Sequence, residues 1–438
     1  MIQGIIILVF LLVMMLLIIA KKIPTAIALI IASIGVCIIA GIPFMAKDAD
    51  GNEIGFLKNV IVSGSTKLAS NIMVALFGAW LGQVMNSTGI TKTMIKKGAE
   101  LGGDKTIVVQ IILLIVSSLL FTTITGLGGT IMVGTIVLPI LISVGVDKVS
   151  AAVTLLLAKG VGATMSTASN KTFSSIVGAD FQIVYNYGLL LGAIFFVGAL
   201  VLVIYRHKKF GKKFAFSAPA EAAQEDDSAF AVKGVLGALA MLTPVIPIIL
   251  IAVLKVEVIP SMMVGIVWAV LTTCLKAGWD RTMNMLTKAL YEGIHNYAPA
   301  LSLMIAIGIL MNAVNHADVS SALAPFMQAI IPGKPVAIVI FFAALAPLCL
   351  YRGPFNLFGM GAGIASLVVG LGLMSPIAAM VGFVSVAAMQ QSSCPTNTQN
   401  VWTADFVGVD VTKITTSMLP IVWATIAVMV TVGAFIHL

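Results

Sequence analysis

Two short polar stretches, STASNKTF at residues 166–173 and SCPTNTQN at residues 393–400, interrupt the most apolar parts of this chain. Each has a central Asn among Ser and Thr. The chain around them is 60% hydrophobic and 10% charged, with a mean hydropathy of +1.11, whereas soluble domains carry about 25% charged residues. Polar groups in such surroundings need partners inside the protein, because lipid offers none. The fold must therefore explain why the chain contains both stretches.

The apolar runs predict an all-α polytopic membrane protein. A helix needs roughly 20 apolar residues to cross a bilayer, and stretches such as IQGIIILVFLLVMMLLIIA (residues 2–20) meet this length without the alternation of barrel strands. Residues 2–20 lack the basic start and the cleavage pattern of a signal peptide, so we expect a retained first helix. The four Cys residues show no CxxC spacing, which predicts neither disulfides nor a metal site.

A charged segment near the middle of the chain suggests two repeats. When the first half is shifted by 227 positions, Asn170 falls on Asn397 and Gly126 on Gly353 without a gap. A shift about two positions larger pairs Asn86 with Asn315. The two polar stretches are therefore expected to be one structural element that the chain uses twice.

Each repeat is expected to contain five crossings, one re-entrant hairpin and one broken helix. The hairpins turn at TGLGGT (125–130) and YRGPFN (351–356), and the helices break at the two polar stretches. An odd number of crossings makes the second repeat inverted. The expected parts are a first repeat, 1–205 (scaffold helices 1–100, hairpin and broken helix 106–178); a linker, 206–232; and a second repeat, 233–438 (scaffold helices 233–330, hairpin and broken helix 335–405).

The basic residues provide an independent test of this topology. Of the 25 Lys and Arg residues, three lie within the apolar zone and five are expected outside, namely Lys47, Lys58, Lys67, Lys255 and Lys334. The other seventeen fall inside, so the termini are predicted outside and the linker in the cytoplasm of a bacterial-type inner membrane. The net charge of +8 is thus explained by orientation and predicts no nucleic-acid partner.

The breaks and tips carry the candidate site, because interrupted helices in inverted repeats point to a binding site near the membrane midplane. Hydroxyl and amide oxygens at the breaks suit a small cation, and glycines let backbone approach a ligand. As substrate-binding residues we predict Arg352, Gly353, Asn356, Gly128, Gly129, Thr130, Ser169, Asn170, Thr396 and Asn397. As ion-coupling residues we predict Gly126, Lys159, Lys171, Thr172, Ser392, Ser393 and Thr398. The alternative is that these side chains only cap half-helices.

Lys159, Lys171 and Arg352 are cations in apolar segments, and residues 148–179 and 335–404 contain no Asp or Glu. Such charges are expensive in a membrane, which suggests that the counter-charge arrives with the substrate. The planar fork of Arg352 suits a carboxylate. Lys171 stands where the other repeat has Thr398, so its ammonium is a candidate substitute for a bound cation. For Lys159 two interpretations stay open: a proton-coupled group, since a buried Lys readily loses its charge, or a side chain that reaches the interface.

The hairpin tips and breaks together resemble the ion-transporter superfamily, which includes divalent-anion/sodium symporters, citrate and gluconate permeases and TRAP membrane subunits. The resemblance implies a homodimer with a moving transport domain. It also implies one cation-type site from Gly126–Thr130 and Ser169–Thr172, and another from Arg352–Asn356 and Ser393–Thr398. Sodium-coupled dicarboxylate members carry Ser-Asn-Thr at the tips, which this chain lacks, so both H⁺ and Na⁺ remain candidates.

The sequence therefore predicts a secondary transporter of a small organic anion, such as gluconate, citrate or a dicarboxylate, that works by an elevator-like motion in the lipid bilayer and holds no cofactor beyond its coupling ion. A cation/proton antiporter would be expected to carry intramembrane Asp or Glu. A membrane enzyme would need a nucleophile, base or metal cluster. An anion exchanger and a channel are further alternatives.

Overall fold

The computed structural model describes residues 2–20, 22–47, 53, 55–210, 234–275 and 277–438. These residues form helices, with one isolated bridge between Lys47 and Glu53 as the only β pairing among them. Nine of the helices are long and apolar enough to cross a membrane, or ten if a bent pair is one span, within the part of the chain that is described. The predicted all-α polytopic fold is confirmed.

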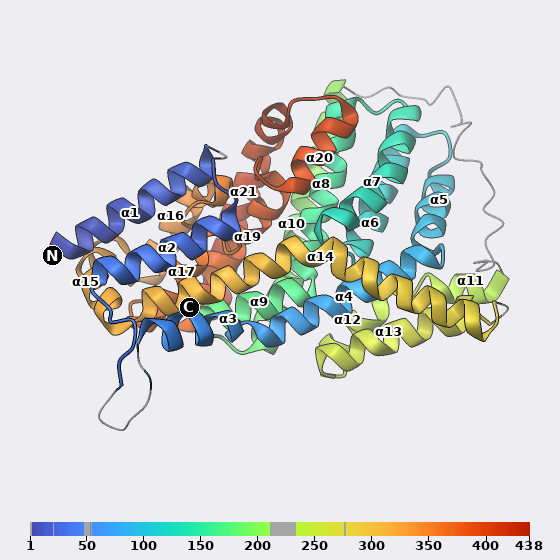
Figure 1. Cartoon of the computed structure of the whole chain (residues 1–438). Coiled ribbons are helices and arrows are strands. Elements are labelled where there is room, and N and C mark those ends of the chain that lie inside the picture. The colour runs from blue at the N-terminus through green and yellow to red at the C-terminus, as the bar shows by residue number, and fades with distance from the viewer. Residues whose placement is uncertain (1, 21, 48–52, 54, 211–233, 276) are drawn as a thin grey trace.

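Both halves of the chain contain equivalent elements in the same order (Figure 1). The first half has α1 (Ile2–Ile19), α2 (Thr25–Ala40), a long helix of η1 (Phe56–Val62), α3 (Ser63–Thr66) and α4 (Ala69–Ser87), α5 (Ile90–Gly102), a hairpin of α6 (Thr106–Leu120) and α7 (Gly126–Ser143), a broken helix of α8 (Lys148–Met165) and α9 (Thr167–Val177), and α10 (Phe181–Phe210). The second half has α11 (Gly234–Ala240) with α12 (Val245–Ala252), α13 (Val258–Thr273), the long α14 (Trp279–Asn315), α15 (Ala317–Ile330), a hairpin of α16 (Pro335–Leu345), η2 (Ala346–Arg352) and α17 (Met360–Gly370), a broken helix of α18 (Pro376–Ala379), η3 (Met380–Val384), α19 (Ser385–Ser393) and α20 (Thr398–Val407), and α21 (Val411–His437).

The two long helices run side by side and in opposite directions through the molecule (Figure 1). Lys67 Nζ, just before α4, donates to Asn312 Oδ1 of α14 at 2.7 Å, and Trp80 Nε1 of α4 donates to the Leu286 carbonyl at 3.1 Å. The residue number rises along one helix while it falls along the other. Because the two helices are equivalent elements, this antiparallel pairing means that the halves are inverted.

A second pair of equivalent helices, α10 and α21, repeats the antiparallel arrangement. The rings of Tyr187 and His437 lie 5.3 Å apart. Further along, Gly198 of α10 contacts Thr425 of α21 so closely that a side chain would collide with it. The hairpins also cross between repeats, since α7 packs on α20 and α17 packs on α9. Each hairpin thus contacts the broken helix of the other half as well as that of its own half.

Four predicted segments differ from the structure. Hydropathy predicts crossings at 69–88 and 297–314, but in the structure these residues belong to longer helices that begin at Phe56 and Trp279. The two long helices are joined by polar contacts, such as that from Asn312 Nδ2 to the Asn59 carbonyl at 2.8 Å. The expected linker, 206–232, begins inside α10, which continues to Phe210, while 211–232 lies outside the described residues. Hydropathy also predicts one straight span at 234–254, but the chain bends there by 52° between α11 and α12, where Pro244 cannot continue the helical hydrogen bonding.

The ends of the broken helices show the repeat most clearly. α9 and α20 end at Gly178 and Gly408, both in the left-handed conformation that Gly tolerates. The next helices are each capped by an Asp two residues later. Asp180 Oδ1 accepts from the Gln182 amide at 2.9 Å, and Asp410 Oδ1 accepts from the Thr412 amide at 2.8 Å. This Gly-x-Asp junction fixes where each terminal long helix starts.

Close packing between the long helices gives a test. A Cβ added at Gly64 of α3 would lie 2.7 Å from Ile309 Cα of α14, a backbone atom that cannot rotate away. We expect Gly64→Val to cost about 1–3 kcal/mol through overpacking and to lower the thermal unfolding midpoint of the detergent-purified protein.

The matched control is Gly333→Val, because Gly333 has no atom within 4 Å of the added Cβ. Its unfolding midpoint should stay at the wild-type value. Equal midpoints for the two variants would contradict the close antiparallel packing.

Candidate functional site

The first break is held together by Asn170. α8 ends at Met165 and α9 begins at Thr167, with Ser166 extended between them (φ −66°, ψ 129°). Asn170 Nδ2 donates to the carbonyls of Thr164 and Ser166, both at 2.9 Å. The side chain is fully buried and its Oδ1 has no hydrogen-bond partner. Asn170 thus occupies the Thr164 carbonyl, which the interruption leaves without a helical partner, and shares the Ser166 carbonyl with its own backbone amide, which donates to it at 3.0 Å.

The second break uses two Asn residues in the same way. Asn397 Nδ2 donates to the Gln390 carbonyl and Asn400 Nδ2 to the Ser392 carbonyl, each at 2.8 Å. Both Oδ1 atoms lack a partner. Only an amide NH₂ can point at a carbonyl oxygen, so these contacts fix which end of each amide is free.

The structure changes the predicted pairing of Asn170 with Asn397. Gly178 and Gly408 differ by 230 positions, not 227, so the second break is longer by three residues. Asn170 and Asn400 stand at equal distances before these glycines. Asn400 is therefore the counterpart of Asn170 in the second half-helix, and Asn397 belongs to the inserted stretch.

The tip of the first hairpin lies against α14. The chain turns between Leu120 and Gly126, so the glycines predicted for the turn instead form the first turn of α7. Gly126 has φ +76°, which favours glycine. A Cβ added there would lie 3.4 Å from the Asn296 carbonyl, and one added at Gly128 would collide with the Asn296 side chain. Small residues are thus needed for the tip to reach α14.

The tip of the second hairpin holds Arg352 in a strained backbone. Tyr351 and Arg352 have φ of +55° and +62°, a conformation that costs a non-glycine residue on the order of 1–3 kcal/mol. Asn356 stabilises the loop, since its Nδ2 donates to the Cys349 carbonyl and its Oδ1 accepts from the Phe358 amide, both at 2.9 Å. Arg352 Nη1 donates to the Phe358 carbonyl at 2.9 Å, while its Nε has no partner.

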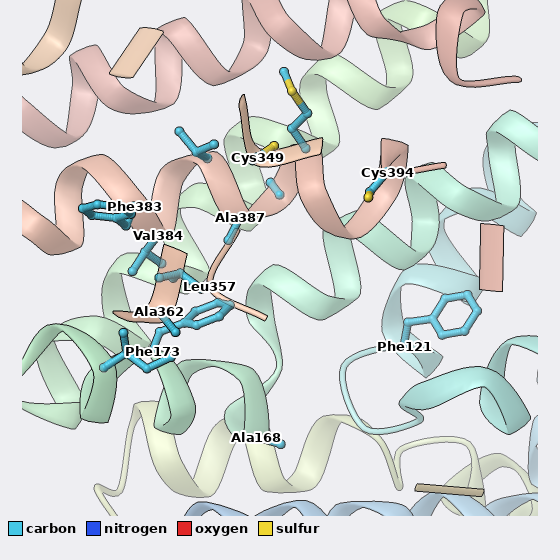
Figure 2. Packing of buried hydrophobic residues seen from close by; sticks show 14 of the residues in the cluster. Phe121, Ala168, Phe173, Cys349, Leu357, Ala362, Phe383, Val384, Ala387 and Cys394 are labelled. Carbon is cyan, nitrogen blue, oxygen red and sulfur yellow. The ribbon is translucent and has the colours of Figure 1, made fainter. Parts of the chain in front are cut away.

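Aromatic packing supports this tip from behind. The ring of Phe355 lies 4.9 Å from Phe342 and 5.7 Å from Phe383, measured between centroids. Figure 2 shows Phe383 in this buried region, where Leu357 and Ala362 of the hairpin and Ala387 of α19 are also found. The second hairpin is therefore anchored on the second broken helix.

A cavity of about 210 Å³ lies between the two tips and the two breaks. Both repeats contribute to it. Its polar lining residues are Thr125, Gly126, Lys159, Ser169, Asn296, Tyr297, Arg352, Gln390, Gln391, Asn397, Thr398 and Gln399, and its apolar ones include Phe121, Ile124 and Phe358.

The structure brings together six of the predicted site residues on the cavity wall: Gly126, Lys159, Ser169, Arg352, Asn397 and Thr398. The other predicted residues are not among those that line the cavity, namely Gly128, Gly129, Thr130, Asn170, Lys171, Thr172, Ser392, Ser393, Gly353, Asn356 and Thr396. Most of these hydroxyls bond locally; Thr130, Thr172 and Ser392 donate to carbonyls one turn earlier. Lys171 Nζ lies 5.1 Å from the centre of the Phe181 ring.

Several lining residues were missed by the sequence reasoning. Thr125 lies 227 positions before Arg352, so the repeat register could have indicated it. Gln390 and Gln391 directly precede the second break. Asn296 and Tyr297 lie in the middle of α14 and had no local signal beyond a polar HNY stretch before Pro299.

The cavity carries positive charge and unused hydrogen-bonding groups. Lys159 and Arg352 line it, and no Asp or Glu does. Among the described residues, no carboxylate lies within ion-pair distance of either cation. Gln390 Oε1, Gln391 Nε2 and Asn397 Oδ1 are buried without partners. Buried polar groups are normally hydrogen-bonded, so this arrangement suits an anionic ligand that also has polar substituents.

No protein-family model matches the chain, and no curated protein matches it. Among solved structures, the chain is similar to the YdaH transporter of Alcanivorax borkumensis, whose crystal structure reveals an unusual topology. The TM-score is 0.58 at 12% sequence identity, and the match covers 99% of this chain and 97% of that chain. The chain therefore shares its fold with a membrane transporter. The predicted membership of the ion-transporter superfamily stays a prediction.

The role of Asn356 can be tested through nearby thiols. All four cysteines are free and buried, and the Tyr351 amide donates to Cys394 Sγ at 3.2 Å. We expect Asn356→Ala to loosen the tip and to speed maleimide labelling of Cys349 and Cys394 at least about threefold, because removing a buried hydrogen-bonding side chain costs about 1–3 kcal/mol.

Cys37 and Cys274 serve as internal controls, because they lie in α2 and after α13, away from the tip. Peptide mapping by mass spectrometry would separate the four sites. Unchanged labelling of Cys349 and Cys394 would show that Asn356 does not hold the tip.

Proposed function

We propose that the protein is a secondary active transporter of a small organic anion, in particular a carboxylate such as gluconate, citrate or a dicarboxylate. The observation that carries this proposal is the charge of the cavity: two cationic side chains line it, and no carboxylate of the protein does. Charge buried without a partner is strongly unfavourable. A bound anion supplies the missing counter-charge.

Arg352 is the residue proposed to hold the carboxylate. The Phe358 carbonyl takes one Nη1 hydrogen bond and leaves Nε free. A guanidinium can bind a carboxylate through two parallel hydrogen bonds. The free amide groups of Gln390, Gln391 and Asn397 are available for further oxygens or hydroxyls of the substrate.

The fold supports transport as the use of this site. The cavity is assembled from hairpins and broken helices of two inverted repeats, the arrangement in which transporters bind substrates near the midplane. We propose alternating access by an elevator-like motion, in which the hairpins and broken helices move against the long helices. α5 and α15, at equivalent places in the repeats, would connect the two parts. The protein would act as a homodimer in the inner membrane with its termini outside.

Coupling to H⁺ or Na⁺ is part of the proposal. The partnerless Oδ1 atoms of Asn170, Asn397 and Asn400 are the oxygens that could face a small cation. A cation/proton antiporter is less well supported, because such a carrier would use a carboxylate in its cavity. An anion exchanger shares the same site and differs only in its coupling.

The decisive experiment is uptake by proteoliposomes of radiolabelled gluconate, citrate and succinate, with Na⁺ and pH gradients imposed separately. We expect accumulation of at least one anion when one of the gradients is inward. Exchange without a response to either gradient would favour the exchanger. Absence of uptake and of exchange for all carboxylates would reject the proposed function.

A substitution tests the place of Arg352. We expect Arg352→Ala to reduce uptake by at least about 30-fold, since removing one partner of a buried charged contact costs 2 kcal/mol or more. The matched control is Arg281→Ala, because Arg281 is exposed near the start of α14 and does not line the cavity. Wild-type uptake by Arg352→Ala protein that elutes as a single folded species would remove Arg352 from the site.

A further inference from the structure

Lys159 lies where the two broken helices cross. It belongs to α8, its side chain is 5% exposed, and it lines the cavity. The next residue, Gly160, is so close to α19 that an added Cβ would lie 2.8 Å from Ser392 Cβ. Among the described residues, no hydrogen bond or ion pair engages the Lys159 ammonium. Its surroundings therefore hold it at the cavity without a protein partner.

Arg352 is the other charged side chain that lines the cavity with Lys159. Of the helices packed against α8, three (α6, α7 and α19) contain no charged residue. The titratable side chains of the others are Lys171 on α9; Tyr185, Tyr187, Tyr205, Arg206, His207, Lys208 and Lys209 on α10; Asp405 on α20; and Lys413 and His437 on α21. Several are engaged elsewhere: Lys171 with Phe181, Tyr187 with Ser385, and Arg206 with Ser150 and Asp147.

The two cations of the cavity differ in one chemical respect. Arg keeps its proton in proteins, whereas Lys can release one. Two like charges in a low-dielectric cavity repel each other, and an anion between them offsets the repulsion. Binding of an anion and binding of a proton to Lys159 therefore favour each other. This linkage couples the two without any carboxylate in the site.

We propose that Lys159 carries the coupling proton. The proposal rests on the anion transport proposed above and specifies its driving ion as H⁺. In the loaded carrier, a proton taken from water on the outer side sits on Lys159 Nζ beside the bound anion. After the anion leaves on the inner side, the proton passes from Nζ to cavity water. The empty carrier then returns with Lys159 neutral and Arg352 as the remaining cation.

The test compares the uptake of labelled gluconate, citrate or succinate by proteoliposomes that contain the Lys159→Arg variant or the wild type, at equal Na⁺ on both sides. One proton per anion predicts up to about tenfold more accumulation per pH unit of inward gradient, because a tenfold ratio corresponds to 1.4 kcal/mol. Lys159→Arg should still exchange labelled for unlabelled anion, since it retains the charge, but should lose the pH response. Lys148→Arg is the control, because Lys148 is exposed at the start of the same helix; it should respond like the wild type.

A second measurement does not depend on the variant. When the transported anion is added to purified wild-type protein in weakly buffered detergent solution, the protein should take up about one proton from the solution per bound anion. A pH-indicator dye would report this as a rise in the pH of the solution. A pH response retained by Lys159→Arg, or no proton uptake by the wild type, would overturn the assignment. Wild-type transport driven by Na⁺ alone would also overturn it while leaving the proposed function intact, whereas no transport of any anion would reject the proposed function itself.

Discussion

Freed backbone carbonyls at two helix breaks are the constraint on which this structure depends. Lipid provides no donor for them, so the chain must provide its own. Asn170 does this at the first break, and Asn397 and Asn400 do it at the second. Because the NH₂ group of each amide donates to a carbonyl, the amide oxygen has no hydrogen-bond partner. The Asn side chains that stabilise the breaks thus also leave polar oxygens near the point where the repeats meet. The amide NH₂ end caps the helix, and the oxygen end remains for a ligand.

Inversion determines what surrounds those atoms. The long helices pair in opposite directions, as do α10 and α21, and each hairpin packs on the broken helix of the other repeat. Both halves consequently contribute residues to the lining of the cavity. Lys159 comes from the first repeat and Arg352 from the second, and close contacts at Gly160 and at the second tip keep both facing the same space. Positive charge is concentrated there because two distant segments each contribute one cation.

The sequence predicted the features that depend on composition and local pattern. Hydropathy predicted the helices, and the two polar stretches predicted the breaks. It did not predict that the helices ending at Ser87 and Asn315 begin as early as Phe56 and Trp279, because their added length packs through contacts between distant segments, such as that of Asn312 with the Asn59 carbonyl. The turn of the first hairpin was predicted at 125–130, but the chain turns before Gly126. The glycines predicted for the turn instead form the closely packed N-terminal end of α7. Asn296 and Tyr297 reach the cavity only through the antiparallel packing of α14, which no local pattern encodes.

The three extra residues in the second break have a further consequence. Two repeats of equal construction could exchange conformations by symmetry, so that the outward-open form would mirror the inward-open one. Here one interruption is a single extended residue, Ser166, and the other is a longer segment that includes Pro395. In a carrier of the proposed kind, the two helix breaks would then differ in stiffness and in the polar groups that they offer to the substrate. The substrate concentration for half-maximal transport would then differ between the two faces of the membrane. Under gradients of equal size, the carrier would transport its substrate faster in one direction than in the other.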